Sequence, residues 1–201
     1  MATNEGARRL SRTGRDVAVI ERLFVPLATG DLRLEPLGEE HREALRQACA
    51  QDQDIWHIYP YSMLGAHFDP AFDTMLDGAR HCYAVFDHDV LVGCTSWYAL
   101  DAPNKAVAIG STFIVPAVRG GPFNLRLKRL MIEHARACGI VRIVFDVDTR
   151  NTRSAAAIRK LGAKLDGVLR QNRITWTGHV RDTAVYSLLP GEESPALKEA
   201  R

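Results

Sequence analysis

The segment from Ala106 to Cys138 constrains the fold more than any other part of the chain. It begins with an apolar, β-branched run that predicts a strand ending at Pro116. After Gly120 and Gly121, apolar residues recur every three and four positions, which predicts an amphipathic helix. A turn between a strand and a helix brings unpaired backbone N–H groups and the positive end of the helix dipole to one point. The junction therefore predicts a turn that can bind an anion.

The segments before this junction predict a strand at 32–37, a helix at 39–49 and a short helix after Pro70. The stretch "CYAVFDHDVLVGCTSWYAL" predicts two strands joined by a tight turn at 87–89. Together with the strand that ends at Pro116, these two strands are expected to form an antiparallel meander.

The segments after the junction alternate between strands and helices. "VRIVFDV" predicts a strand covered on both faces, and Asn151 begins a helix that ends at Gly162. Two more strands are expected near 164–169 and 182–188. Because strands come first as a meander and later alternate with helices, the predicted class is α+β with a mixed sheet.

The length of 201 residues, with 46% hydrophobic residues, fits a single domain with a sizeable core. Residues 1–16 are rich in Arg, Ser, Thr and Gly, which predicts a flexible N-terminal extension. A second flexible tail is expected at 191–201, so the folded domain is expected to span 17–190.

The charge and the cysteines limit the kinds of partner. A formal net charge of +2 gives no reason to expect a nucleic-acid or membrane partner. The four cysteines are far apart, without a C-x-x-C motif, which disfavours a metal site and a disulfide scaffold. Free thiols and the absence of a long apolar run predict a cytoplasmic protein without a membrane segment.

The glycine turn admits two interpretations from its local sequence, a phosphate cradle or a tight turn whose glycines only provide a positive φ. A Walker-type loop is excluded because no Lys-Ser/Thr pair follows the glycines, and a Rossmann motif because its glycine spacing is absent. Pro122 also removes one N–H donor from such a cradle.

Four segments in order resemble the GNAT superfamily of acyl-CoA-dependent N-acyltransferases, within it the RimJ/RimL-like branch: "GDLRLEPLGEEH", "IGSTFIVPAVRGGPFNLRLKRLMIEHA", "NTRSAAAIRKLGAKLDGVLR" and "GHVRDTAVYSLL". The resemblance runs from about Thr29 to Gly191. In this branch the loop commonly reads R-G-T-G-x-N with a later lysine. The matching positions are Arg119, Gly120, Asn124 and Lys128, whereas Gly121 and Pro122 depart from the pattern.

The resemblance implies a mixed, mostly antiparallel twisted sheet with a splayed central strand and flanking helices. It makes 17–190 a single acyl-CoA-dependent N-acyltransferase domain that uses acetyl-CoA. The splayed strand would bind the pantetheine arm through its backbone, and the glycine turn would bind the pyrophosphate. The implied cofactor-binding residues are Phe113, Ile114, Val115, Arg119, Gly120, Gly121, Phe123, Asn124, Lys128, Asn151 and Ser154. For Asn151 and Ser154, helix capping and a first-turn position are the alternative structural interpretations.

Acyl transfer from a thioester to an amine needs a neutral amine, a donor for the developing oxyanion and a proton for the departing thiolate. The backbone N–H of Ile114 suits the oxyanion, and Ser154 is a candidate proton donor. The glutamate and tyrosine that many family members use correspond here to Ala108 and Ile158. The general base could instead be one of four residues that belong to no recognised motif, namely His57, His81, Asp101 and Asp182.

Without a glutamate base, the site favours acceptors whose amine has a low pKa and is therefore neutral in a larger fraction of molecules. An α-amino group with a pKa near 8 is roughly a tenth neutral at pH 7, whereas a lysine amine is neutral only at about one part in a few thousand. The acceptor pocket is expected to be built from aromatic residues for which core packing is the alternative interpretation, namely Trp56, Tyr59, Tyr61, Trp97 and Tyr98. Arg181 and Asp182 are expected to form a structural ion pair.

The sequence therefore predicts an acetyl-CoA-dependent N-acetyltransferase that acts on a peptide N-terminus or a small amine, as a monomer or homodimer. The alternative is a catalytically silent CoA-binding or interaction module, because Ala108 and Ile158 stand at positions where functional residues are usual.

Overall fold

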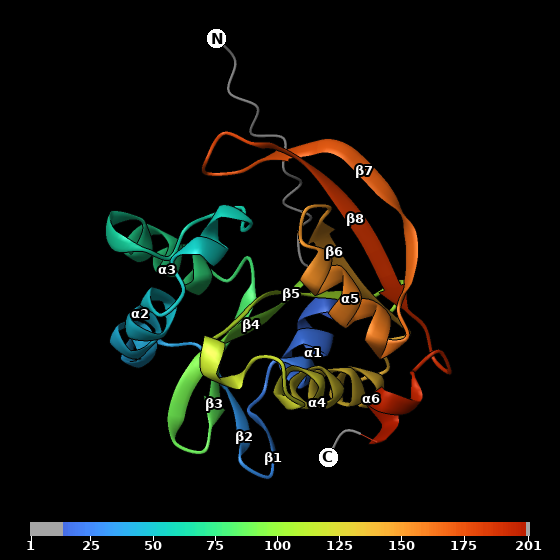
Figure 1. The fold of residues 1–201 in the computed structure, drawn as a ribbon. Helices are drawn as coiled ribbons and strands as arrows, with labels where there is room; N and C mark the ends of the chain where they lie inside the picture. Colours follow the sequence, from blue (N-terminus) through green and yellow to red (C-terminus); the bar gives the residue numbers. More distant parts are fainter. Residues whose placement is uncertain (1–13, 200–201) are drawn as a thin grey trace.

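The computed structural model describes residues 14–199 as one twisted sheet of eight strands with helices packed around it (Figure 1). The strands are β1 (Leu27–Thr29), β2 (Leu32–Pro36), β3 (His81–Asp87), β4 (Val90–Asp101), β5 (Ala106–Ile114), β6 (Arg142–Asp148), β7 (Lys164–Ile174) and β8 (Val180–Leu188). They lie in the order β1-β2-β3-β4-β5-β6-β8-β7. Every neighbouring pair is antiparallel except β5 and β6, which are parallel. The predicted α+β class with a mixed, mostly antiparallel sheet is confirmed.

Six α-helices and four short 3₁₀ helices connect the strands within the described residues. The α-helices are α1 (Gly14–Leu23), α2 (Arg42–Ala50), α3 (Phe68–Leu76), α4 (Phe123–Ala137), α5 (Thr152–Leu161) and α6 (Pro195–Glu199). The 3₁₀ helices are η1 (Glu39–His41), η2 (Asp54–His57), η3 (Gly65–His67) and η4 (Pro116–Val118). None of the helices in residues 14–199 has the length and apolar character needed to cross a membrane.

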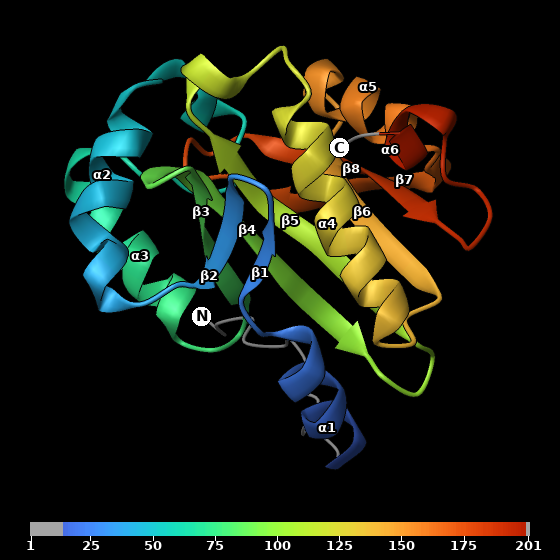
Figure 2. The same ribbon diagram turned by 90° about the horizontal axis from the view of Figure 1, so that it is seen from below.

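The helices cover both faces of the sheet, which follows from the alternation of side chains along β5. Thr112 accepts a hydrogen bond from Lys128 on α4, whereas the neighbouring Phe113 packs against Trp56 of η2 with ring centroids 4.9 Å apart. Successive residues of a strand point to opposite faces. Helix α4 therefore lies on one face, as Figure 2 shows, and η2 lies on the other.

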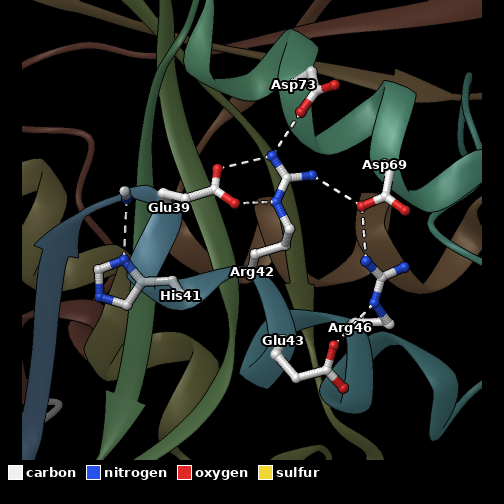
Figure 3. Close-up of polar contacts among 8 residues, drawn as sticks. Glu39, His41, Arg42, Glu43, Arg46, Asp69 and Asp73 are labelled. Atoms are coloured by element: carbon white, nitrogen blue, oxygen red, sulfur yellow. Dashed lines mark hydrogen bonds and ion pairs between the residues drawn. The ribbon is translucent and has the colours of Figure 1, made fainter.

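Helices α2 and α3 are joined by a network of ion pairs that Figure 3 shows in close-up. The guanidinium of Arg42 contacts Glu39, Asp69 at 2.9 Å and Asp73 at 2.6 Å. Arg46 also reaches Asp69, at 2.7 Å. The two arginines additionally lie over Phe72 and Phe68 of α3, at 4.3 and 4.2 Å from the ring centroids. The network therefore connects α2 to α3.

Strands β5 and β6 pair only at their beginning and then separate. Their register covers Ala106–Ala108 against Arg142–Val144, while β5 stays paired with β4 as far as Ile114. The positive φ of Ser111, 51°, lies where the β4–β5 register shifts, and a bulge of this kind bends a strand. The splayed central strand expected from the sequence is therefore present, and the gap faces β6.

The two ends differ from the expectation of flexible segments. Residues 14–16 of the expected extension belong to α1, and residues 1–13 lie outside the described part. At the other end, Leu197 of α6 is only 2% exposed, and Ser194 donates its backbone N–H to Leu161 O at 2.9 Å. The segment after Gly191 therefore packs onto α5, because it carries an apolar residue and a capping serine that the polar composition concealed.

Candidate active site

A cleft of about 410 Å³ opens where β5 and β6 diverge. One wall is β5 with the glycine turn, the other is β6 with the start of α5, and the far end is lined by residues of η2, β4, β7 and β8. The cleft is therefore continuous from the glycine turn, through the splay, to a pocket beyond it. The sequence segments predicted to bind a cofactor and an acceptor meet in this one cleft.

The glycine turn has the geometry of an anion cradle. Gly120 has a φ of +77°, and nothing lies within 4 Å of the position that a Cβ on Gly120 or Gly121 would take. The first helical hydrogen bond of α4 runs from Arg126 N to Pro122 O, so the N–H groups of Phe123 and Asn124 precede the bonded part of the helix. Pro122 itself stands at the N-cap, where its lack of an N–H removes no helical hydrogen bond.

The Arg119 side chain is bonded to neighbouring residues and stabilises the glycine turn. Its Nε donates to Ile114 O at 2.7 Å, and its guanidinium pairs with Asp52. Burial would raise the pKa of Asp52, but the hydrogen bond from Arg119 holds that pKa below its ordinary value. Because Asp52 also accepts the N–H of Ile55 at 3.2 Å, the pair ties the glycine turn to the start of η2.

The backbone of Ile114 faces the splay. Val115 N donates to Val92 O at 2.8 Å, so the N–H of Val115 points toward β4. Because backbone groups alternate along an extended strand, the Ile114 N–H points the other way, toward β6. On the same edge, the hydroxyl of Tyr59 donates to Thr112 O. One backbone donor of the predicted oxyanion site is thus aimed into the cleft.

Lys128, which the family resemblance assigns to cofactor binding, is buried and bonded to the splayed strand. Its Nζ donates to Thr112 Oγ1 at 2.6 Å, and the residue is only 6% exposed. Burial lowers the pKa of Lys128 to about 7. The side chain lies on the sheet-facing side of α4, so it is a buried amine on the cleft wall beside the splayed strand.

Asn151 and Ser154 line the cleft where α5 begins. Asn151 is the N-cap of α5, and its side chain accepts the backbone N–H of Ser154 at 2.9 Å. The predicted capping interpretation is confirmed for Asn151, and the cap holds both residues at the cleft.

The aromatic residues predicted to bind the acceptor divide into two groups. Tyr59, Tyr61 and Tyr98 line the pocket beyond the splay. Trp56 and Trp97 are 1% and 0% exposed and belong to the core, so their predicted acceptor contact is wrong. Trp97 and Tyr98 are neighbours on β4 and therefore point to opposite faces of the sheet.

Three of the predicted cofactor residues also contribute side chains only to the core. They are Phe113, Val115 and Phe123, all at most 6% exposed. Any contact that they make with a ligand in the cleft must come from their backbone.

Asp146 is a cleft residue that the sequence reasoning missed. It lies on β6 opposite the splayed part of β5, is exposed, and accepts the hydroxyl of Tyr98 at 3.0 Å. Burial, with Asp146 beside it, raises the pKa of Tyr98 above its ordinary value. The sequence did hold a signal for Asp146, because it is a charged residue within the apolar run "VRIVFDV". A charged residue in such a strand needs polar groups or solvent around it.

Arg181 pairs with Asp148 rather than with the predicted Asp182. Its Nε lies 3.8 Å from Asp148 Oδ2, while Asp182 accepts the N–H of Gln171 at 2.6 Å. The prediction fails because adjacent residues on β8 face opposite sides. Asp148 is already held by Arg150 at 2.7 and 3.0 Å, and these bonds keep its pKa below its ordinary value despite burial, which would raise it.

The other base candidates named from the sequence lie away from the cleft. Among His57, His81, Asp101 and Asp182, none is part of its lining. Ile158 lines the cleft, and Ala108 is buried in the paired part of β5. No group of three His, Cys, Asp or Glu side chains in residues 14–199 is arranged to hold a metal ion.

The cleft fits the acyl-CoA that the sequence predicts. The open space at Gly120 and Gly121, the unpaired N–H groups at the start of α4 and the backbone edge at Ile114 are suited to a phosphate and an extended amide chain.

A family model for the acetyltransferase (GNAT) domain matches residues 31–164. Among solved structures, a Chromobacterium violaceum ATCC 12472 protein described as a probable acetyltransferase of the GNAT family is 28% identical, with a TM-score of 0.76 and coverage of 84% of this chain and 93% of that one. A GCN5-related N-acetyltransferase from Brucella melitensis is 24% identical, with a TM-score of 0.78 and coverage of 87% and 82%.

RimL, a ribosomal L7/L12 alpha-N-protein acetyltransferase solved in complex with coenzyme A, shares the fold with a TM-score of 0.67 at 21% identity. That match covers 82% of this chain and 97% of the RimL chain. No curated protein matches the sequence.

Proposed function

Because the chain belongs to the GNAT acetyltransferase family and has RimL among its structural neighbours, we propose that it transfers the acetyl group of acetyl-CoA to the nitrogen of a primary amine. The observation that carries this proposal is the divergence of β5 from β6 directly beside the glycine turn. We also propose a cytoplasmic location, which the four free cysteines favour.

Two groups of residues bind acetyl-CoA, one at its pyrophosphate and one at its extended arm. The N–H groups of Gly120, Gly121, Phe123 and Asn124 hold the pyrophosphate, with the positive end of α4 behind them. The free edge of β5 around Ile114 pairs with the amide groups of the extended arm. When bound, acetyl-CoA supplies an activated thioester carbonyl to the splay.

The reaction forms a C–N bond between the amine and the acetyl carbonyl and breaks the C–S bond of the thioester. The Ile114 N–H stabilises the negative charge that develops on the carbonyl oxygen. Asp146 attracts the amine and receives the proton that nitrogen releases as the C–N bond forms. The departing thiolate needs little help because a thiol has a pKa of about 8.5, and Ser154 passes it a proton from water, so that the serine hydroxyl is restored.

The acceptor is an amine of low pKa, such as a peptide N-terminus or a small amine. The site has no buried glutamate at Ala108 to deprotonate a strongly basic amine, whereas an α-amino group is roughly a tenth neutral at pH 7. The pocket of Tyr59, Tyr61 and Tyr98 beyond the splay encloses this amine.

Isothermal titration with acetyl-CoA tests the binding part of the proposal. Gly120→Asp places a carboxylate in the open space of the cradle and should weaken binding at least tenfold. Gly120→Asn is the matched control, since asparagine has nearly the same shape, tolerates a positive φ and carries no charge. It should weaken binding less.

Asn124→Ala should also weaken acetyl-CoA binding, because Asn124 lies on the cleft wall at the start of α4. Unchanged affinity in both Gly120→Asp and Asn124→Ala would remove the phosphate-site assignment.

The apolar residues at Ala108 and Ile158 favour one alternative, a silent CoA-binding module. A panel of peptides, polyamines and aminoglycosides separates the two functions. Binding of acetyl-CoA without transfer to any of them supports the silent module, whereas transfer above the solution rate supports the enzyme.

A further inference from the structure

The acceptor end of the cleft carries three arginines from two distant parts of the chain. Arg80 precedes β3, Arg173 lies on β7 and Arg181 lies on β8, and all three line the pocket together with Tyr98 and Asp146. Tyr98 is within electrostatic reach of Arg80 and Arg173, and Arg181 is within reach of Asp146 and Tyr98. The five side chains therefore form one cluster.

The positive charges of this cluster are only weakly paired within residues 14–199, since the one ion pair is the 3.8 Å contact of Arg181 with Asp148. Arg173 and Arg181 are directly opposite each other in the β7–β8 register, where like charges repel. Within residues 14–199, no ion pair is formed by Arg80 or Arg173, and Arg80 lies over the ring of Tyr98 at 4.3 Å. The cluster thus has more positive charge than the protein neutralises.

Arg181 gives the sharpest indication of a missing anion. It is only 5% exposed, yet its buried Nε has no hydrogen-bond partner in the described part of the chain. The nearest carboxylate, on Asp148, is 3.8 Å away and is already bound at both oxygens by Arg150. Because Arg181 lines the cleft and its one ion pair is long, a carboxylate bound in the cleft would supply negative charge that the protein does not.

We propose that the acceptor is a primary amine bearing a carboxylate a few bonds from its nitrogen, with the carboxylate held by Arg80, Arg173 and Arg181 and the amine held at Asp146. This proposal rests on the proposed function and names the substrate class of the same site. Arginine binds carboxylates through paired N–H donors, and Asp146 provides the opposite charge for an ammonium group. An amine without an acidic group leaves the arginine cluster unneutralised.

Two pairs of probe compounds test the proposal, each pair differing by one negative charge. Asp-Ala-amide against Asn-Ala-amide represents a peptide N-terminus, and alanine against alaninamide represents a free amino acid. With saturating acetyl-CoA, we expect kcat/KM for the acid of at least one pair to exceed that of its amide at least tenfold. A preference in the first pair indicates that the carboxylate belongs to the side chain of a peptide's N-terminal residue, and a preference in the second pair indicates that it belongs to a free amino acid.

Arg173→Gln should reduce the preference for the acid several-fold or more, and because Arg173 is exposed, its replacement should not disturb folding. Arg170→Gln is the matched control, since Arg170 lies on the same exposed strand and does not line the cleft. It should keep the preference. Neither variant should change the affinity for acetyl-CoA.

Titration of the same compounds into the CoA-bound protein separates this inference from the proposed function. Selective binding of the acids that is lost in Arg173→Gln supports the charge recognition even if no acetyl transfer is found. Equal kcat/KM and equal binding within both pairs overturns the inference, while acetylation of any neutral amine in the same assay leaves the proposed function standing.

Discussion

The environment of Lys128 changes its acid–base chemistry. The amine of Lys128 is buried under α4 and hydrogen-bonded to Thr112, with a pKa lowered to about 7 by burial. In the unfolded chain a lysine has a pKa of about 10.4. Between these two values the unfolded chain binds one more proton than the folded protein, so Lys128 makes the protein more stable as the pH rises from 7 to 10.

Lys128→Met removes this dependence, because methionine fills a similar volume without a charge. The free energy of unfolding of the wild type, relative to Lys128→Met, should rise with pH by up to about 1.4 kcal/mol per unit between pH 7 and 10. Urea titrations at several pH values measure it. Lys160→Met, at an exposed position, is the control and should run parallel to the wild type. Parallel curves for Lys128→Met as well would contradict a neutral buried amine.

At the scale of elements, the C-terminal ends of α4 and α5 have similar local structure but different packing against the rest of the chain. Both helices are followed by glycine with a positive φ, +87° at Gly139 and +104° at Gly162. Nothing lies within 4 Å of a Cβ at Gly139, whereas a Cβ at Gly162 would lie 2.0 Å from Glu192 O. Only the second turn is covered by the C-terminal segment.

Gly139→Ala should cost about 1 kcal/mol, from the left-handed backbone alone. Gly162→Ala should cost roughly 2 to 4 kcal/mol, since it must also displace the segment that bonds to Leu161 O and Lys160 O through Ser194. Urea denaturation measures both variants, and hydrogen exchange at the Ser194 N–H should rise only in Gly162→Ala. Equal costs would show that the segment is not fixed to the turn.

At the scale of the whole molecule, the β7–β8 hairpin lines one side of the proposed acceptor pocket with Arg173 and Arg181, and its tip is fixed to the η2 segment. The long arm of these two strands reaches back toward the α2–α3 side of the sheet (Figure 1). At its tip, the indole N–H of Trp176 donates to Trp56 O at 2.8 Å, and the backbone N–H of Trp176 donates to Pro60 O at 3.2 Å. The hairpin thereby holds Arg173 and Arg181 opposite the η2 segment.

Trp176→Ala should raise the KM for the acceptor about tenfold, since loss of one side-chain hydrogen bond and of the ring packing is worth roughly 1 to 2 kcal/mol. The dissociation constant of acetyl-CoA should not change, because Trp176 is not part of the cleft lining. Trp176→Phe keeps ring packing against His57 and His67 without the N–H and should show an intermediate effect. A parallel loss of acetyl-CoA affinity would mean that the hairpin supports the entire cleft.

The fold and the glycine-turn side of the cleft could be predicted largely because their signals are local. The strand, glycine turn and helix around Gly120 are adjacent in the chain, and so are the Asn151 cap and the glycine that ends α5. The physical determinants of such features are backbone φ values, capping groups and hydrophobic periodicity within a few residues.

The acceptor side could not be predicted, because its residues are brought together only by the tertiary structure. Arg80, Asp146 and Arg181 come from three separate parts of the chain and carry no common motif. Which of two neighbours such as Trp97 and Tyr98 faces the cleft depends on strand register.

The sequence by itself thus determined the order of the main elements, the α+β class and the glycine turn between strand and helix, all properties of adjacent residues. Only the tertiary structure decided that Lys128 is a buried amine, that Asp146 faces the splay and that Arg181 has an unpaired nitrogen. Burial and charge pairing depend on what the rest of the chain places around a residue, and a strand's neighbours are chosen by packing of the whole sheet.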